Sequence, residues 1–140
     1  MKTARVLIVE DNIDNYELVR FLLERDGHEV LWARSGREGV SLARADQPDL
    51  ILMDLTLPEM DGWTATQTLK SQPETAEIPV IALTAHTLPG DRKRALEVGC
   101  DAYLSKPLNI TQFSETIAQT LDKISAGRKP KSNPEEGAAL

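Results

Sequence analysis

Short apolar runs alternate with longer amphipathic stretches along most of this chain. The apolar runs occupy residues 6–9, 30–33, 50–53, 80–83 and 102–104. The first, third and fourth runs are almost continuous in aliphatic residues and methionine, as is typical of strands buried on both faces of a parallel sheet. The second run is more mixed, which favours a strand at the edge of the sheet. This pattern predicts five short strands.

The stretches between the runs carry helix signals, as parallel strands need long crossover connections. We predict helices over 13–26, from the capping box Ser35-Gly-Arg-Glu38, over 61–71, from 91 to 99, and after Asn109. The last helix is the clearest, because Phe113, Ile117, Leu121 and Ile124 recur at helical spacing. Strand and helix alternate five times, which predicts a doubly wound α/β sheet with helices on both faces.

The alternation ends near residue 125. The last residues, AGRKPKSNPEEGAAL, are rich in Gly, Pro, Ser and charge and hold too few apolar residues to pack into a core. A chain of 140 residues fits one domain. We therefore expect a single domain over 1–125 and a flexible tail over 126–140, with no second output domain.

Composition excludes some classes of protein. The chain is 41% hydrophobic and 27% charged, as a soluble globular protein is, and its net charge of −6 argues against general binding to nucleic acid. It shows neither a secretory signal nor a run long enough to span a bilayer. Its one cysteine, Cys100, excludes an internal disulfide and fits a reducing compartment. We expect a cytoplasmic protein that binds neither nucleic acid nor membrane directly.

Polar residues follow four of the predicted strands. These are Glu10 and Asp11 after the first, Asp54 after the third, Thr84 after the fourth and Lys106 after the fifth. Singly they have ordinary roles: helix cap for Asp11, turn residue for Asp54, backbone hydrogen bonding for Thr84, and surface charge for Lys106. Ligands of open parallel sheets, however, bind beyond the carboxyl ends of the strands, where the winding direction reverses. The joint placement therefore favours one shared site.

The residue types at this site predict its chemistry. Three neighbouring carboxylates repel one another and require a compensating cation, and Mg²⁺ prefers such oxygen ligands while also binding phosphate. Zinc does not fit, because neither His nor Cys is in the set. Asp54 can form an acyl phosphate when held in line with a phosphorus atom, with Lys106 attracting the phosphoryl oxygens and Thr84 donating a hydrogen bond. The pattern predicts magnesium-dependent phosphoryl transfer.

Four stretches resemble the receiver domains of bacterial response regulators. They are VLIVEDN at 6–12, LILMDLTLPEMDG at 50–62, IPVIALTAH at 78–86 and DAYLSKP at 101–107. The resemblance covers residues 4 to about 124 and implies a flavodoxin-like fold of five parallel strands, ordered 2-1-3-4-5, with five helices. It also implies that a histidine kinase phosphorylates Asp54.

The resemblance implies a role for each residue of the site. Asp11, Asp54 and the backbone carbonyl of Thr56 would bind Mg²⁺. Glu10, which stands where many receivers have an aspartate, would assist directly or through water.

A conformational switch is implied as well. In the family, the hydroxyl at Thr84 moves toward the phosphoryl group and the aromatic ring at Tyr103 turns inward, which remodels the face of the fourth helix, fifth strand and fifth helix. A cis peptide is implied at Lys106-Pro107. The expected partners are a histidine kinase and either a downstream protein target or a histidine phosphotransfer domain, so the switch and relay roles both remain open. We expect a monomer or weak homodimer that is a phosphoacceptor rather than an enzyme.

Other classes of protein fit the pattern less well. A flavin-binding electron carrier can share the topology, but its phosphate loop should offer small residues and backbone N–H groups instead of Glu10-Asp11-Asn12. A hydrolase with an aspartyl nucleophile expects a second acid where this chain has Thr56. A receiver that no longer accepts phosphate is disfavoured by the complete acidic, hydroxyl and amine set.

Five other residues stand out less. We expect His28 on the surface, Cys100 in the core as a small apolar group, and Trp32 and Trp63 in packing or at a partner surface. His86 is expected near the mouth of the site.

Overall fold

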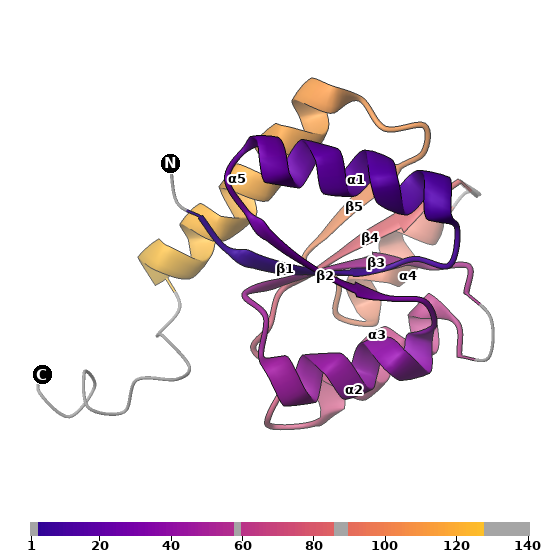
Figure 1. Cartoon of the computed structure of the whole chain (residues 1–140). Coiled ribbons are helices and arrows are strands. Elements are labelled where there is room, and N and C mark those ends of the chain that lie inside the picture. The colour runs from indigo at the N-terminus through magenta and orange to yellow at the C-terminus, as the bar shows by residue number, and fades with distance from the viewer. Residues whose placement is uncertain (1–2, 58–59, 86–89, 128–140) are drawn as a thin grey trace, which may run out of the picture.

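Strands and helices alternate in a computed structural model that describes residues 3–57, 60–85 and 90–127 (Figure 1). The strands are β1 (Arg5–Val9), β2 (Glu29–Ala33), β3 (Leu50–Asp54), β4 (Val80–Thr84) and β5 (Ala102–Ser105). The helices are α1 (Ile13–Arg25), α2 (Gly36–Asp46), α3 (Gly62–Ser71), α4 (Asp91–Glu97) and α5 (Ile110–Gly127). The predicted strands and helices are thus confirmed. No helix within the described ranges combines the length and apolarity of a membrane span.

The strands form one parallel sheet in the order β2-β1-β3-β4-β5, which confirms the predicted order. β2 lies at an edge, as its mixed pattern predicted. Helices α1 and α5 cover one face of the sheet, and α2, α3 and α4 cover the other (Figure 1). In the sheet, β2 lies on one side of β1, and β3 lies on the other side of β1. The winding direction therefore reverses between β1 and β3, where such folds bind their ligands.

Alternate residues of the central strands fill two separate cores, because successive side chains of a strand point to opposite faces. On the side of α1 and α5 the strands contribute Val6, Ile8, Leu50, Leu52, Ile81 and Leu83. On the side of α2, α3 and α4 they contribute Leu7, Val9, Ile51, Met53, Val80 and Ala82. Burial on both faces explains the continuous apolar runs, and it anchors the ends of the strands from which the polar residues emerge.

Side-chain caps start four of the described helices at the carboxyl edge of the sheet. The side chain of Asn12 accepts a hydrogen bond from a backbone N–H of α1, Ser35 does so for α2, and Asp61 does so for α3. For α5, Asn109 Oδ1 accepts the Gln112 N–H at 2.9 Å, as predicted. One half of the predicted capping box is confirmed, because Ser35 Oγ accepts the Glu38 N–H at 3.1 Å. In the other half, Glu38 Oε1 accepts the N–H of Arg34, at 2.7 Å, rather than that of the N-cap residue Ser35. These caps fix where the chain leaves the carboxyl edge of the sheet, at which the site is predicted.

The structure corrects one residue and extends one element. His28 is buried at 6% exposure, so its predicted surface position is wrong. Its Nδ1 accepts the N–H of Ala4, which is distant in sequence, and burial lowers the pKa of the imidazole. Cys100 is buried, as predicted. Helix α5 extends to Gly127, two residues beyond the predicted domain end at 125. The remaining residues of the predicted tail, 128–140, lie outside the described residues, and so does His86.

Gly62 packs against the backbone that carries Asp54. A Cβ at Gly62 would lie 2.3 Å from the Asp54 carbonyl oxygen and 2.5 Å from the Leu55 Cα. We expect Gly62→Ala to lower the free energy of unfolding by about 2 kcal/mol or more, because backbone atoms cannot yield as a flexible side chain can. Urea denaturation measures this. Gln67→Ala, at an exposed position of the same helix, is the control, and equal stability of the two variants would contradict the close approach.

Candidate functional site

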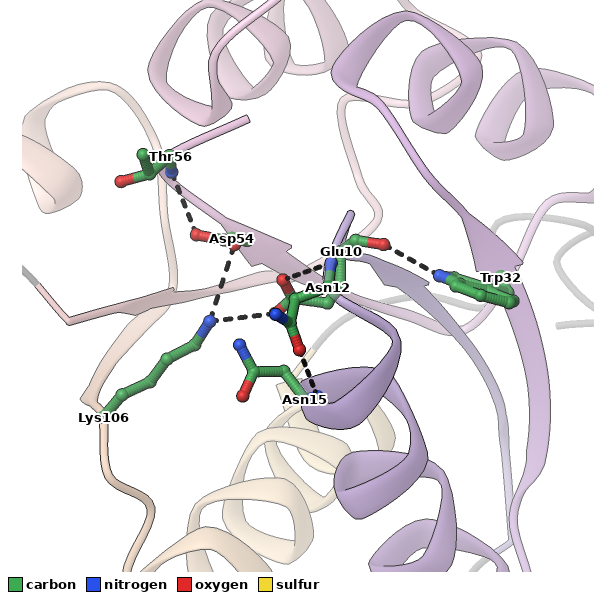
Figure 2. Close-up of polar contacts among 7 residues, drawn as sticks. All are labelled: Glu10, Asn12, Asn15, Trp32, Asp54, Thr56 and Lys106. Atoms are coloured by element: carbon green, nitrogen blue, oxygen red, sulfur yellow. Dashed lines mark hydrogen bonds and ion pairs between the residues drawn. The ribbon is translucent and has the colours of Figure 1, made fainter. Parts of the chain in front are cut away.

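The register of the sheet brings the predicted site residues to one edge. Asp54 ends β3 opposite Leu83 of β4, and Thr84 follows Leu83. Glu10 directly follows β1, the other neighbour of β3. The backbone N–H of Lys106 donates to the Thr84 carbonyl oxygen at 2.8 Å, which brings the lysine to the same edge. Figure 2 shows the side chains of Glu10, Asp54 and Lys106 turned toward one another.

Three carboxyl groups form a tight cluster there. One carboxylate oxygen from each of Glu10, Asp11 and Asp54 lies within 4.8 Å of the other two. Glu10 and Asp54 are buried, whereas Asp11 is exposed. Oxygen donors this close together repel when ionised and would suit a hard cation such as Mg²⁺, which prefers oxygen ligands. The donor set thus fits the predicted metal.

The ammonium group of Lys106 contacts both buried acids. Its Nζ lies 2.9 Å from Glu10 Oε1 and 3.5 Å from Asp54 Oδ2. One ammonium beside three ionised carboxylates leaves the cluster negative. The lysine therefore connects β1, β3 and the end of β5 without balancing the charge of the site.

Burial controls the acidity of Asp54. Loss of solvent raises the pKa of its carboxyl to about 7. The N–H of Thr56, which donates to Oδ1 at 2.9 Å, lowers this pKa, the neighbouring Glu10 raises it, and Lys106 lowers it. A divalent cation beside Asp54 would favour the ionised form, so the charge of Asp54 is linked to cation binding.

The remaining predicted residues lie around this cluster. Thr84 is buried at the end of β4, and Tyr103 is half-buried on β5, where burial raises the pKa of its hydroxyl. Thr56 is held against Asp54 by its N–H, and the role of its carbonyl stays a prediction. The Lys106-Pro107 peptide is cis, as the resemblance implied.

Two contacts of Glu10 were missed by sequence reasoning. The backbone N–H of Asn12 donates to Glu10 Oε2 at 3.2 Å. The indole Nε1 of Trp32 donates to the Glu10 carbonyl oxygen at 2.8 Å (Figure 2). The only signal for the second contact was a tryptophan near the end of the strand beside β1. The prediction that Trp32 lies in packing or at a partner surface did not include this hydrogen bond.

The fold and the site define a doubly wound α/β protein with an acidic cluster at its topological switch point. Residues 6–118 match the family described as the response regulator receiver domain. The chain belongs to this family, which acts in two-component signal transduction.

Several similar proteins share most of the length of the chain. It is 49% identical over 119 residues to the polar-differentiation response regulator DivK of Brucella ovis, covering 85% of this chain and 97% of that protein. A signal receiver domain of a histidine kinase from Syntrophus aciditrophicus is 35% identical, with a TM-score of 0.81 over 91% of this chain and 95% of that one. The receiver domain of a sensor histidine kinase from Pseudomonas aeruginosa is 33% identical, with a TM-score of 0.79 over 86% and 99% of the two chains. That structure has a magnesium ion coordinated in its active site cleft.

The raised pKa of Asp54 predicts a pH-dependent effect of Asp54→Asn on stability. A carboxyl whose pKa rises from 3.8 to about 7 on folding stabilises the protein at low pH, and this contribution is lost as the pH rises through the folded value. Between pH 5 and pH 8 the magnesium-free wild type should therefore lose on the order of 2 kcal/mol relative to the variant. Urea denaturation with a chelator at both pH values measures this difference. A difference that does not change with pH would contradict the raised pKa.

Proposed function

We propose that this protein is a stand-alone response regulator of the cytoplasm that accepts a phosphoryl group from a histidine kinase on Asp54. The observation that carries this proposal is the convergence of Glu10, Asp11 and Asp54 within 4.8 Å, with Lys106 against the two buried acids. Membership of the receiver family and the likeness to DivK over 97% of that protein support it.

The acidic cluster supplies the magnesium site of this proposal. Asp11, Asp54 and the Thr56 carbonyl would bind Mg²⁺, and Glu10 would assist directly or through water. Bound there, Mg²⁺ would neutralise the carboxylates and orient the oxygens of the incoming phosphoryl group. Because Asp11 is exposed while Asp54 is buried, the donor would approach from the side of Asp11.

Asp54 is the proposed nucleophile. One of its carboxylate oxygens forms a bond to phosphorus as the P–N bond of a phosphohistidine breaks, and an acyl phosphate results. Lys106, which already contacts Asp54, would stay beside the phosphoryl oxygens as a fixed positive charge. The Thr84 hydroxyl would donate a hydrogen bond to the same group. Slow hydrolysis of the acyl phosphate would reset the protein.

The signal would leave the site through β4 and β5. Thr84 ends β4, and Tyr103 lies on the adjacent strand β5. A new negative charge at Asp54 would draw the Thr84 hydroxyl inward and bias the orientation of Tyr103. The changed face of α4, β5 and α5 would then bind a downstream protein.

Acetyl phosphate tests the nucleophile. The wild type should gain the mass of one phosphoryl group only when Mg²⁺ is present, and Asp54→Asn should gain none, because the amide is not a nucleophile for phosphorus. Intact-protein mass spectrometry measures both. Asp122→Asn, at an exposed aspartate of α5, is the control and should label as the wild type does. Equal labelling of Asp54→Asn, or labelling without Mg²⁺, would remove Asp54 from this role.

Asp11→Asn tests the proposed metal ligand. Loss of one charge and of a strong oxygen donor should weaken Mg²⁺ binding by about tenfold or more. Isothermal titration calorimetry measures the dissociation constant. Asp14→Asn, at an exposed acid in the first turn of α1, removes the same charge outside the cluster and should have a smaller effect. Equal effects of the two substitutions would argue against ligation by Asp11.

A further inference from the structure

The side chain of Trp32 contacts the acidic site at a backbone carbonyl and not at one of the carboxylates. Its indole Nε1 donates to the carbonyl oxygen of Glu10 at 2.8 Å, and Figure 2 shows the indole reaching Glu10 from the side opposite Lys106. Trp32 lies on the edge strand β2, in register with Ile8 of β1. The bond therefore joins β2 to the segment that carries Glu10 and Asp11.

This side-chain bond lies where the backbone ladder between β1 and β2 ends. The Glu10 N–H still donates to the Ala33 carbonyl oxygen at 2.9 Å. In a parallel ladder the Glu10 carbonyl would next accept the N–H of Ser35. However, β2 ends at Ala33, and Ser35 is the N-cap of α2. The indole satisfies a buried acceptor that the diverging strands no longer pair.

Neighbouring side chains hold the indole in this orientation. The ring of Tyr16 on α1 stacks on Trp32 with centroids 3.9 Å apart and an interplanar angle of 6°. The guanidinium carbon of Arg34 lies 4.9 Å from the centre of the Trp32 ring. Stacking and cation–π contact restrict rotation of the ring. The direction of the N–H is thereby fixed relative to both α1 and β1.

The accepting carbonyl belongs to the peptide between two acids of the cluster. Because a peptide group is planar, holding the Glu10 carbonyl also holds the Asp11 nitrogen, and so restricts where the Asp11 side chain leaves the backbone. The other acid of the pair is already held, since the two carboxylate oxygens of Glu10 accept from Lys106 Nζ and the Asn12 N–H. Asp11 is the exposed member of the cluster, and the orientation of this peptide constrains it.

We propose that Trp32 is a positioning residue of the acidic site. Its indole N–H fixes the peptide between Glu10 and Asp11 and so preorganises Asp11 for Mg²⁺. This role rests on the proposed function, in which Asp11 is a magnesium ligand. Without the bond, Asp11 would have to be ordered when the metal binds, and affinity would fall.

Trp32→Phe is the direct test, because phenylalanine keeps a ring for Tyr16 and removes the N–H. The dissociation constant for Mg²⁺, measured by calorimetry on the full chain, should rise about two- to tenfold, the effect of one hydrogen bond. Trp63→Phe is the matched control. Trp63 lies on α3 with Arg94 4.1 Å from its ring centre, and this substitution should leave the dissociation constant unchanged. Circular dichroism checks that both variants are folded.

The outcomes separate this inference from the proposed function. Equal dissociation constants for the wild type and Trp32→Phe overturn the positioning role, while the magnesium site stands. A wild type that does not bind Mg²⁺ removes the proposed function itself.

Fluorescence gives a second readout that does not depend on the Trp32→Phe variant folding. In Trp63→Phe, Trp32 is the remaining tryptophan of the two in the chain. Its emission should change on addition of Mg²⁺ with the midpoint found by calorimetry, and this change should be lost in Trp63→Phe/Asp11→Asn at the same concentrations. An equal change of emission in Trp63→Phe and in Trp63→Phe/Asp11→Asn overturns the proposal, because Trp32 would then respond to Mg²⁺ without Asp11.

Discussion

Three carboxyl groups lie within 4.8 Å of one another at the carboxyl edge of the sheet, and their mutual repulsion must be offset by the rest of the molecule. Lys106 offsets part of it, through contacts with Glu10 and Asp54. Protonation of Asp54, favoured by burial, or binding of a cation offsets more. We therefore expect the site to respond strongly to a change in local charge, and the phosphorylation proposed for Asp54 would be such a change.

Such a cluster persists because the strands that carry it are anchored from both faces. β1 and β3 place alternate residues in two cores, so neither strand end can relax without exposing apolar surface. The caps at Asn12, Ser35 and Asp61 fix where the chain turns away from this edge. Repulsion within the site is thus balanced by packing outside it. A fold of this kind can hold neighbouring carboxylates together before a cation binds and stabilises them.

Local patterns predicted most of the fold and the polar residues that the structure brings to one edge of the sheet. Continuous apolar runs identified the buried strands, and the Ser35 box identified the start of α2, because strand burial and helix capping depend on residues close in sequence. Sequence reasoning failed at His28, whose burial depends on a partner 24 residues away. It also underestimated Trp32, whose bond to Glu10 spans two strands. Both failures concern contacts between separate elements.

The amino-acid sequence by itself determined which residue types follow the ends of the strands. Acids, a hydroxyl and an amine therefore meet at one edge of the sheet. Strand periodicity is local, and the topology of parallel sheets does the rest. Only the tertiary structure decided that Lys106 lies closer to Glu10 than to Asp54, that burial raises the pKa of Asp54, and that Trp32 holds the Glu10 carbonyl. These properties depend on through-space distance and on lost solvent, which arise when segments far apart in the chain pack together.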